Sequence, residues 1–257
     1  MNAIHAECKN CHHSLNVDDK FCSKCGQSTE THKINLHYVT HELIHGILHL
    51  DGGIINTTIA LFTKPGIMVR EYLEGKRKNH FSPIIYIVIL STLMALIMHY
   101  VYHDKYVELS LIGDKKPTDI QKRMIEMFGP AFSWVSKHFT LIYLIQIPIM
   151  AFAFYIPFKK MSKYNYFEWL LIISFCVIQL MLITITFQLL NRIFPGILFL
   201  SNLFVFVSLT WTIVELFSKF DLAKVIINYI LSLIILFFIL STVTVGFLFS
   251  YLNSNPI

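Results

Sequence analysis

The sequence has little charge for its length, which excludes most water-soluble proteins. Only 14% of its 257 residues are Asp, Glu, Lys or Arg, whereas a soluble domain has about 25%. In contrast, 55% of the residues are hydrophobic and the mean hydropathy is +0.59. This composition predicts a protein whose apolar surface faces lipid. The opening stretch MNAIHAECKN lacks an apolar run and a small-residue cleavage site, so we expect no signal peptide.

Five apolar stretches, none of which contains Lys or Arg, are rich in Leu, Ile and Phe. They cover residues 83–102, 139–158, 167–190, 197–217 and 225–252. Each is long enough to cross the hydrocarbon core of a membrane, which takes roughly 20 residues. Strands are excluded by this length, and lipid offers no hydrogen-bond partners to unpaired backbone groups. The sequence therefore predicts an all-α integral membrane protein with about five transmembrane helices.

The Lys and Arg residues are distributed unevenly between the two sides of these spans. Of 21 in total, fourteen precede the first span or lie in the second and fourth loops, and seven lie in the first and third loops. Cytoplasmic loops carry the excess of Lys and Arg. We therefore predict a cytoplasmic N-terminus and, because the number of spans is odd, a C-terminus on the outside.

Four of the five cysteines form two C-x2-C pairs near the N-terminus: Cys8, Cys11, Cys22 and Cys25. Two such turns can present four thiolates to one tetrahedral zinc ion. Disulfides are disfavoured in the reducing cytoplasm, and iron in the same four-sulfur cage is the alternative metal. Four sulfur ligands leave no open coordination position, so we predict a structural zinc. The fifth cysteine, Cys176, lies in the third predicted span and is expected to pack as a small apolar residue.

The charge of this N-terminal head argues against nucleic-acid binding. Three lysines (Lys9, Lys20 and Lys24) are outnumbered by four acidic residues, namely Glu7, Asp18, Asp19 and Glu30. The head therefore lacks the basic surface that phosphate groups require. We expect a cytoplasmic protein partner in addition to membrane lipids. A head of this size cannot build a core of its own, so metal binding is expected to fold it.

A row of four histidines follows the head at four-residue spacing. His37, His41, His45 and His49 would share one side of a helix, and apolar residues would fill the other side. Such a helix is too polar to span a membrane, and we expect it at the inner membrane surface. The most economical interpretation of the histidine row is a side that faces water or lipid headgroups. A second metal site or a proton site at His41, Glu42, His45 and His49 is the alternative.

The same row contains His41-Glu42-Leu43-Ile44-His45, which matches the HExxH motif of zinc proteases. Site-2-type intramembrane proteases resemble this chain in combining HExxH with an LDG motif, here residues 50–52. In that family, however, HExxH lies within a span and the aspartate comes from a distant one. Here Asp51 follows His45 closely, and the motif lies outside every predicted span. A metalloprotease is therefore the third and least favoured interpretation.

A basic segment precedes the first span. A turn at residues 64–66 leads into a short helix that Gly75 is expected to end, and Ser82 with Pro83 would open the span. Four cations in this segment are expected to contact anionic lipid headgroups or another phosphate: Arg70, Lys76, Arg77 and Lys78.

Several of these features together resemble one bacterial family: the CxxC…CxxCGQ head, the helix ending in LDGG, Thr57, and the segment PGIMVREYLEGKRKNHFSP. The family is a domain of unknown function, with a zinc ribbon followed by a multi-span membrane region. The resemblance covers about residues 8–90. It implies zinc and the bacterial inner membrane, but no reaction, and the family is not classed among peptidases.

Among the polar side chains inside the predicted spans, four are candidates for an intramembrane polar site: Gln146, Gln179, Gln188 and Glu215. Polar groups inside lipid need a partner. The favoured interpretation is hydrogen bonding between helices, worth about 0.6 kcal/mol per pair. The alternative is a polar cavity for a substrate, a lipid headgroup or an ion.

We therefore predict three parts: a zinc ribbon at residues 1–30, interfacial amphipathic helices with the GKR motif at residues 31–81, and a five-span bundle at residues 82–257. The leading functional hypothesis is a zinc-headed binding, scaffold or sensor module rather than an enzyme. The alternative is a small transporter or lipid-handling protein. The sequence does not determine the oligomeric state.

Overall fold

The computed structural model describes residues 6–16, 18–29, 34–35, 53–101, 118–123, 126–127, 129, 134, 138–194 and 196–254. At its N-terminal end, β1 (Ala6–Glu7) pairs antiparallel with β2 (Ser14–Leu15) in a small head. The helices are α2 (Gly53–Thr63), α3 (Pro65–Leu73), α4 (Pro83–Leu96) with its π-helical continuation η2 (Ile97–Val101), α7 (Phe139–Ser162), α8 (Tyr166–Asn191), α9 (Leu198–Leu216) and α10 (Leu222–Ser254).

Among the described residues, five helices are long and apolar enough to cross a membrane. They are Pro83–Tyr100, Phe139–Ser162, Tyr166–Asn191, Leu198–Leu216 and Leu222–Val243. This confirms the prediction of a helical protein with five membrane-spanning segments. Local signals explain the boundaries: α4, for example, begins at Pro83, whose fixed φ and missing N–H suit the first position of a helix.

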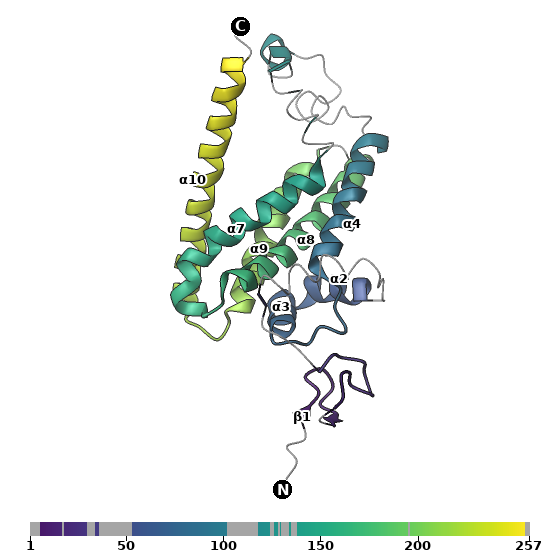
Figure 1. The fold of residues 1–257 in the computed structure, drawn as a ribbon. Coiled ribbons are helices and arrows are strands. Elements are labelled where there is room, and N and C mark those ends of the chain that lie inside the picture. The colour runs from purple at the N-terminus through teal and green to yellow at the C-terminus, as the bar shows by residue number, and fades with distance from the viewer. Residues whose placement is uncertain are drawn as a thin grey trace.

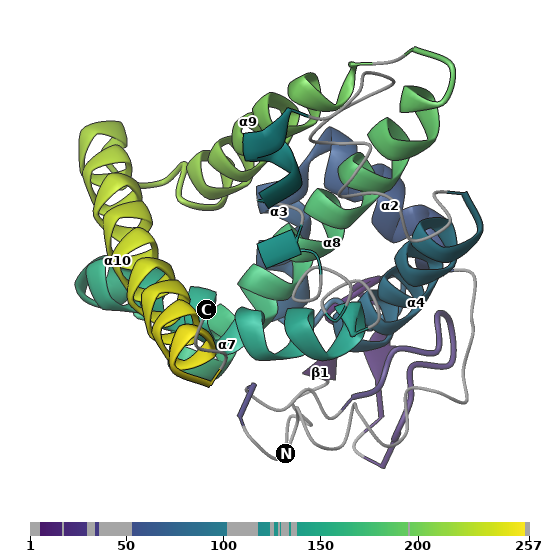
Figure 2. The same ribbon diagram turned by 90° about the horizontal axis from the view of Figure 1, so that it is seen from above.

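The third span, α8, lies at the centre of the bundle. It packs against α4, α7 and α9, and it also contacts α2 and α3. In the most apolar stretch of α8, 67% of the residues are buried inside the protein. The corresponding share is 17% in both α9 and α10. Figure 2 shows α10 at the edge of the bundle, where it packs chiefly against α7. The exposed apolar sides of α9 and α10 are therefore the surfaces that lipid would cover.

Aromatic rings pack tightly where α7, α8 and α9 meet. Trp169 of α8 is fully buried, and its ring centroid lies 5.2 Å from that of Phe158 and 5.9 Å from that of Phe217. Phe154 completes the cluster from α7, at 6.1 Å from Trp169. These rings hold the ends of three helices together through apolar burial and favourable tilted contacts.

The start of α8 is fixed by its own sequence. The Asn165 side chain accepts a hydrogen bond from the Glu168 N–H (2.9 Å), and the Glu168 carboxylate accepts one from the Asn165 N–H (2.7 Å). This capping box satisfies two backbone donors that the helix cannot pair internally. The carboxylate in the first turn also suits the positive end of the helix dipole.

The head, α2 and α3 lie at the same end of the bundle, and α10 extends toward the opposite end (Figure 1). Helix α3 is anchored by Tyr72, which is 2% exposed and packs edge-on against Phe175 of α8 at 5.0 Å between ring centroids. Helix α2 is anchored by the buried Thr57 hydroxyl, which accepts a hydrogen bond from the Phe81 N–H at 2.8 Å. This end of the bundle therefore carries the candidate site.

Candidate metal centre and its junction with the bundle

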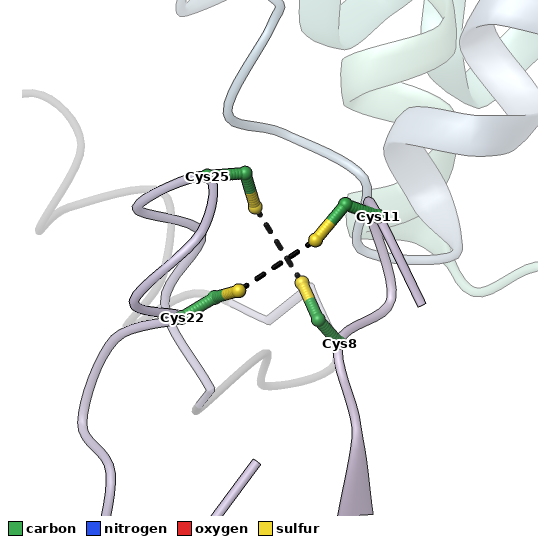
Figure 3. A group of neighbouring side chains, drawn as sticks. All are labelled: Cys8, Cys11, Cys22 and Cys25. Atoms are coloured by element: carbon green, nitrogen blue, oxygen red, sulfur yellow. Dashed lines mark hydrogen bonds between the residues drawn. The ribbon is translucent and has the colours of Figure 1, made fainter. Parts of the chain in front are cut away.

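The four cysteines of the head converge on one point, as Figure 3 shows. Their sulfur atoms all lie within 4.8 Å of one another. The Sγ–Sγ distance is 3.6 Å for Cys8 and Cys25 and 3.6 Å for Cys11 and Cys22. A tetrahedron with metal–sulfur bonds of about 2.3 Å has edges of about 3.8 Å. The spacing of these free thiols therefore fits a single metal ion with four sulfur ligands.

Two turns of the same design present these cysteines. In each turn, the N–H of the first cysteine donates to the carbonyl of the residue five positions later. The N–H of the residue after the second cysteine donates to the carbonyl of the first cysteine. The bonds are Cys8 N–H to His13 C=O (2.9 Å), His12 N–H to Cys8 C=O (2.9 Å), Cys22 N–H to Gln27 C=O (2.8 Å) and Gly26 N–H to Cys22 C=O (2.8 Å). The head is thus built from two copies of one metal-binding turn.

The residue after the second cysteine has a positive φ in both turns, +57° for His12 and +73° for Gly26. The sequence indicates this conformation at Gly26, because glycine adopts it without strain. It does not indicate it at His12, because a non-glycine residue rarely has a positive φ. The signal that could have predicted it is the internal repeat, in which His12 takes the place of Gly26.

The thiols differ in their tendency to ionise. A hydrogen bond from the backbone of Gln27 lowers the pKa of the Cys25 thiol to about 6, despite partial burial. At Cys11 the backbone of His13 acts in the same direction, but burial and the three other thiols outweigh it and raise the pKa to about 12. Four thiolates side by side repel one another, and a divalent ion supplies the charge that offsets this repulsion.

Gln27 joins the head to the bundle. Its side chain is only 5% exposed, and its Oε1 accepts hydrogen bonds from the N–H groups of Arg77 (3.1 Å) and Lys78 (2.9 Å). Its Nε2 donates to the Ser28 carbonyl at 3.3 Å. The sequence shows CGQ and GKR, which lie on the two sides of this contact, as separate motifs. Sequence reasoning missed that one binds the other.

The loop that Gln27 contacts is shaped by the end of α3. Gly75, with φ +104°, donates its N–H to the Tyr72 carbonyl (3.1 Å), and Lys76 donates to the Glu71 carbonyl (2.9 Å). These two bonds form a Schellman motif, which confirms that Gly75 ends this helix. The N–H groups of the next two residues then face the head.

Helices α3 and α9 cap each other. The Gly66 N–H donates to Oε2 of Glu215 at 2.7 Å, while the Arg70 guanidinium donates to the carbonyls of Glu215 (2.8 Å) and Leu216 (2.5 Å). An anion thus lies at the positive end of α3 and a cation at the negative end of α9. A Cβ atom at Gly66 would lie 2.2 Å from the Leu216 nitrogen, so only glycine permits this approach.

The four cations predicted to contact headgroups differ in their surroundings. Arg70 binds the end of α9, as described above. Lys76 forms an ion pair with Glu71 at 3.0 Å. Arg77 lies over the Tyr72 ring at 5.5 Å and donates to the Tyr72 carbonyl at 3.2 Å. The Lys78 side chain passes close to Gly26 of the head. Contact of these residues with lipid or phosphate stays a prediction.

The four polar residues of the spans also have different environments. Gln179, fully buried on α8, donates to the Leu61 carbonyl of α2 (2.9 Å) and accepts from the Thr212 hydroxyl of α9 (2.9 Å). Glu215 contacts α3, as described above. Gln188 is buried on α8, and Gln146 is half-buried on α7. Gln179 therefore forms hydrogen bonds between helices, which is what the favoured interpretation expects. These hydrogen bonds do not connect Gln179 to Glu215.

The predicted histidine helix lies outside the described residues, and with it His41, Glu42, His45 and His49. A second metal site or a proton site there stays a prediction, and so does the HExxH protease. Within the described part of the chain, the cysteine cluster is the one group of metal-ligating side chains close enough together to hold an ion.

A family described as a protein of unknown function, DUF3667, matches residues 51–95. The matched segment comprises α2, α3, the loop that contacts Gln27, and α4 up to its penultimate residue. No curated protein and no solved structure matches the chain. From the end of the histidine row to the first span, the chain is therefore similar to DUF3667, a family without an established function.

Proposed function

We propose that this protein is a zinc-headed docking and sensor module anchored in the bacterial inner membrane by a five-helix bundle, with its head in the cytoplasm. One observation carries the proposal: a four-sulfur cluster lies on a small head at one end of a bundle with five apolar helices. The excess of Lys and Arg in the segments at that end of the bundle supports a cytoplasmic head.

The composition of the head's interior supports a structural zinc ion. Its buried cluster consists of Cys8, Cys22 and Leu15, with Cys11 and Cys25 packed against them. Leu15 alone cannot supply the apolar burial that a fold of this size needs. The free energy of ion binding would therefore be the free energy that folds the head. With four sulfur ligands the ion has no position left for a substrate, which favours a binding role over catalysis.

An exposed aromatic residue of the head supports a docking role. Phe21 is 64% exposed and directly precedes the metal ligand Cys22. Aromatic residues are enriched among the side chains that dominate protein–protein interfaces. The partner surface is therefore expected to offer an apolar pocket for this ring.

The test is cross-linking in intact membranes followed by purification of the full-length protein. We expect the Cys22→Ser, Cys25→Ser double variant to lose its cross-linked partners because the head unfolds. Phe21→Ala is expected to lose the same partners while it retains zinc in elemental analysis. Cys176→Ala, which removes the thiol outside the cluster, is the matched control.

Equal recovery of the same partners by the wild type and by both head variants would contradict the docking function. A protease-sensitive tag on the head tests the orientation independently. We expect the tag to be cleaved only in inverted vesicles, and cleavage in intact cells would contradict a cytoplasmic head.

A further inference from the structure

We propose that Gln27 transmits the state of the metal site to the loop between α3 and α4, so that ion binding locks the head onto the bundle. We call this contact, between the Gln27 side chain and the backbone of residues 77–78, the latch. It goes beyond partner docking, because it lies within one chain and needs no partner.

The first step joins the ion to Gln27. The backbone of Gln27 is hydrogen-bonded to two of the metal ligands. Its carbonyl accepts the Cys22 N–H at 2.8 Å, and its N–H contacts the Cys25 thiol. Hydrogen bonds from N–H groups to ligand sulfurs are part of the outer shell that orients a metal site. The position of the Gln27 backbone is therefore set by the same turn that presents both cysteines to the ion.

The second step joins Gln27 to the loop. An amide oxygen has two lone pairs, and Gln27 directs Oε1 at two successive donors, the N–H groups of Arg77 and Lys78. A single glutamine can satisfy both donors only if its Cα and side chain are held in one orientation. With the side chain 5% exposed, water has little access to compete for these bonds. Release of the ion removes the constraint on the turn and thereby weakens both bonds.

The third step joins the loop to the helices. The Schellman bonds of Gly75 and Lys76 tie the loop to the last turn of α3. The other end of α3 is held on α9 by Gly66 and Arg70. The latch therefore attaches the head to an element that is already fixed to the bundle. Ion release should free the loop amides first and leave the contact between α3 and α9 in place.

A separate contact keeps the head tethered when the latch opens. The Ile34 carbonyl accepts a hydrogen bond from Nδ2 of Asn165, the residue that caps α8, and Ile34 is 1% exposed. Ile34 follows the head in the chain and does not contribute to the metal site. Loss of the ion would therefore let the head move about this anchor.

Amide hydrogen exchange of the full-length protein in nanodiscs tests the latch, because it reports on the N–H groups of Arg77 and Lys78 directly. With zinc bound, we expect both to be protected. Removal of zinc by a chelator should accelerate their exchange at least tenfold, whereas the Gly66 N–H, bonded to Glu215, should change less than twofold.

Three variants separate the latch from the metal site itself. Gln27→Ala should lose protection at residues 77 and 78 while it keeps its zinc, measured by elemental analysis. Gln27→Glu, which keeps an acceptor oxygen at the position of Oε1, should restore protection. Phe21→Ala, which truncates an exposed side chain of the head and is expected to keep its zinc, is the matched control, with exchange as in the wild type.

Protection at residues 77 and 78 that persists after zinc removal, or in zinc-loaded Gln27→Ala, would overturn the proposal. Loss of zinc from Gln27→Ala would overturn it as well, because Gln27 would then hold the ion rather than transmit its presence. None of these results depends on partner capture, so the latch and the docking function can fail separately.

Discussion

The head and the bundle of this protein are held together in different ways. In the head, the buried cluster consists of Cys8, Cys22 and Leu15, with the partly buried Cys11 and Cys25 packed against it. In the bundle, large side chains such as Trp169, Phe154 and Phe158 are completely buried, and α8 alone contacts five other helices. The head therefore depends on one coordination centre, whereas the bundle depends on many weak contacts spread over several helices.

This difference predicts two independent modes of failure. A single change at the metal site should abolish the fold of the head at once, because nothing else there can replace the ion. A single change in the bundle should lower its stability by a limited amount, because neighbouring contacts remain. The predictions below test this contrast in order of decreasing effect.

The largest effect is expected on metal removal. Cys8→Ser should eliminate ion binding and unfold the head, because apparent binding free energies of structural zinc sites are about 10–16 kcal/mol and supply the folding energy. Elemental analysis should show no bound zinc, and amides of residues 6–29 should exchange freely. The helical circular dichroism of the bundle should remain. Unfolding of the bundle together with the head would contradict the independent stability of the two regions. Cys176→Ala is the control, and it should retain zinc.

An intermediate effect is expected at the junction of α3 and α9. Gly66→Ala places a methyl group 2.2 Å from the Leu216 nitrogen. Overpacking of this kind destabilises by about 1–3 kcal/mol. Chemical unfolding in detergent should show this loss while the zinc content stays unchanged. The control is Ile67→Ala at the next residue, which is 39% exposed and should cost less. A Gly66→Ala variant as stable as the wild type would show that the close approach of α3 and α9 does not contribute to stability.

The smallest effect is expected for Gln179→Leu. The change removes the bonds to the Leu61 carbonyl and the Thr212 hydroxyl, and such bonds inside membrane proteins are worth about 0.6 kcal/mol each. Unfolding in detergent should therefore show a loss of about 1 kcal/mol. Gln146→Leu, at a half-buried position on α7, should change stability less. A larger loss from Gln146→Leu would assign the more important polar contact to α7.

The parts of the fold that the sequence predicts correctly follow from local rules. Long apolar runs predict the five spans because lipid imposes a minimum helix length. Gly75 and Pro83 predict helix boundaries because their effects act within one turn. The spacing of the cysteines predicts their cluster because each pair closes a short turn. None of these inferences requires knowledge of which helices are neighbours.

The parts that the sequence does not predict depend on such neighbours. Glu215 is recognisable as a carboxylate in an apolar segment, but its partner, the Gly66 N–H, lies 149 residues away. Arg70 belongs to a basic segment, which suggests lipid headgroups, yet in the structure its guanidinium binds carbonyl oxygens of α9. Gln27 is one of many polar residues in the head. Its role follows only from the two N–H groups that the end of α3 directs toward it.

The mutual capping of α3 and α9 has a consequence for biogenesis. The ribosome makes Gly66 long before Glu215, and at about 5–20 residues per second the delay is roughly 7 to 30 s. Throughout that interval the first turn of α3 must use water or lipid headgroups in place of its final acceptor. The amino-terminal end of α3 therefore cannot form its final hydrogen bond until the fourth membrane segment of the nascent chain has been inserted.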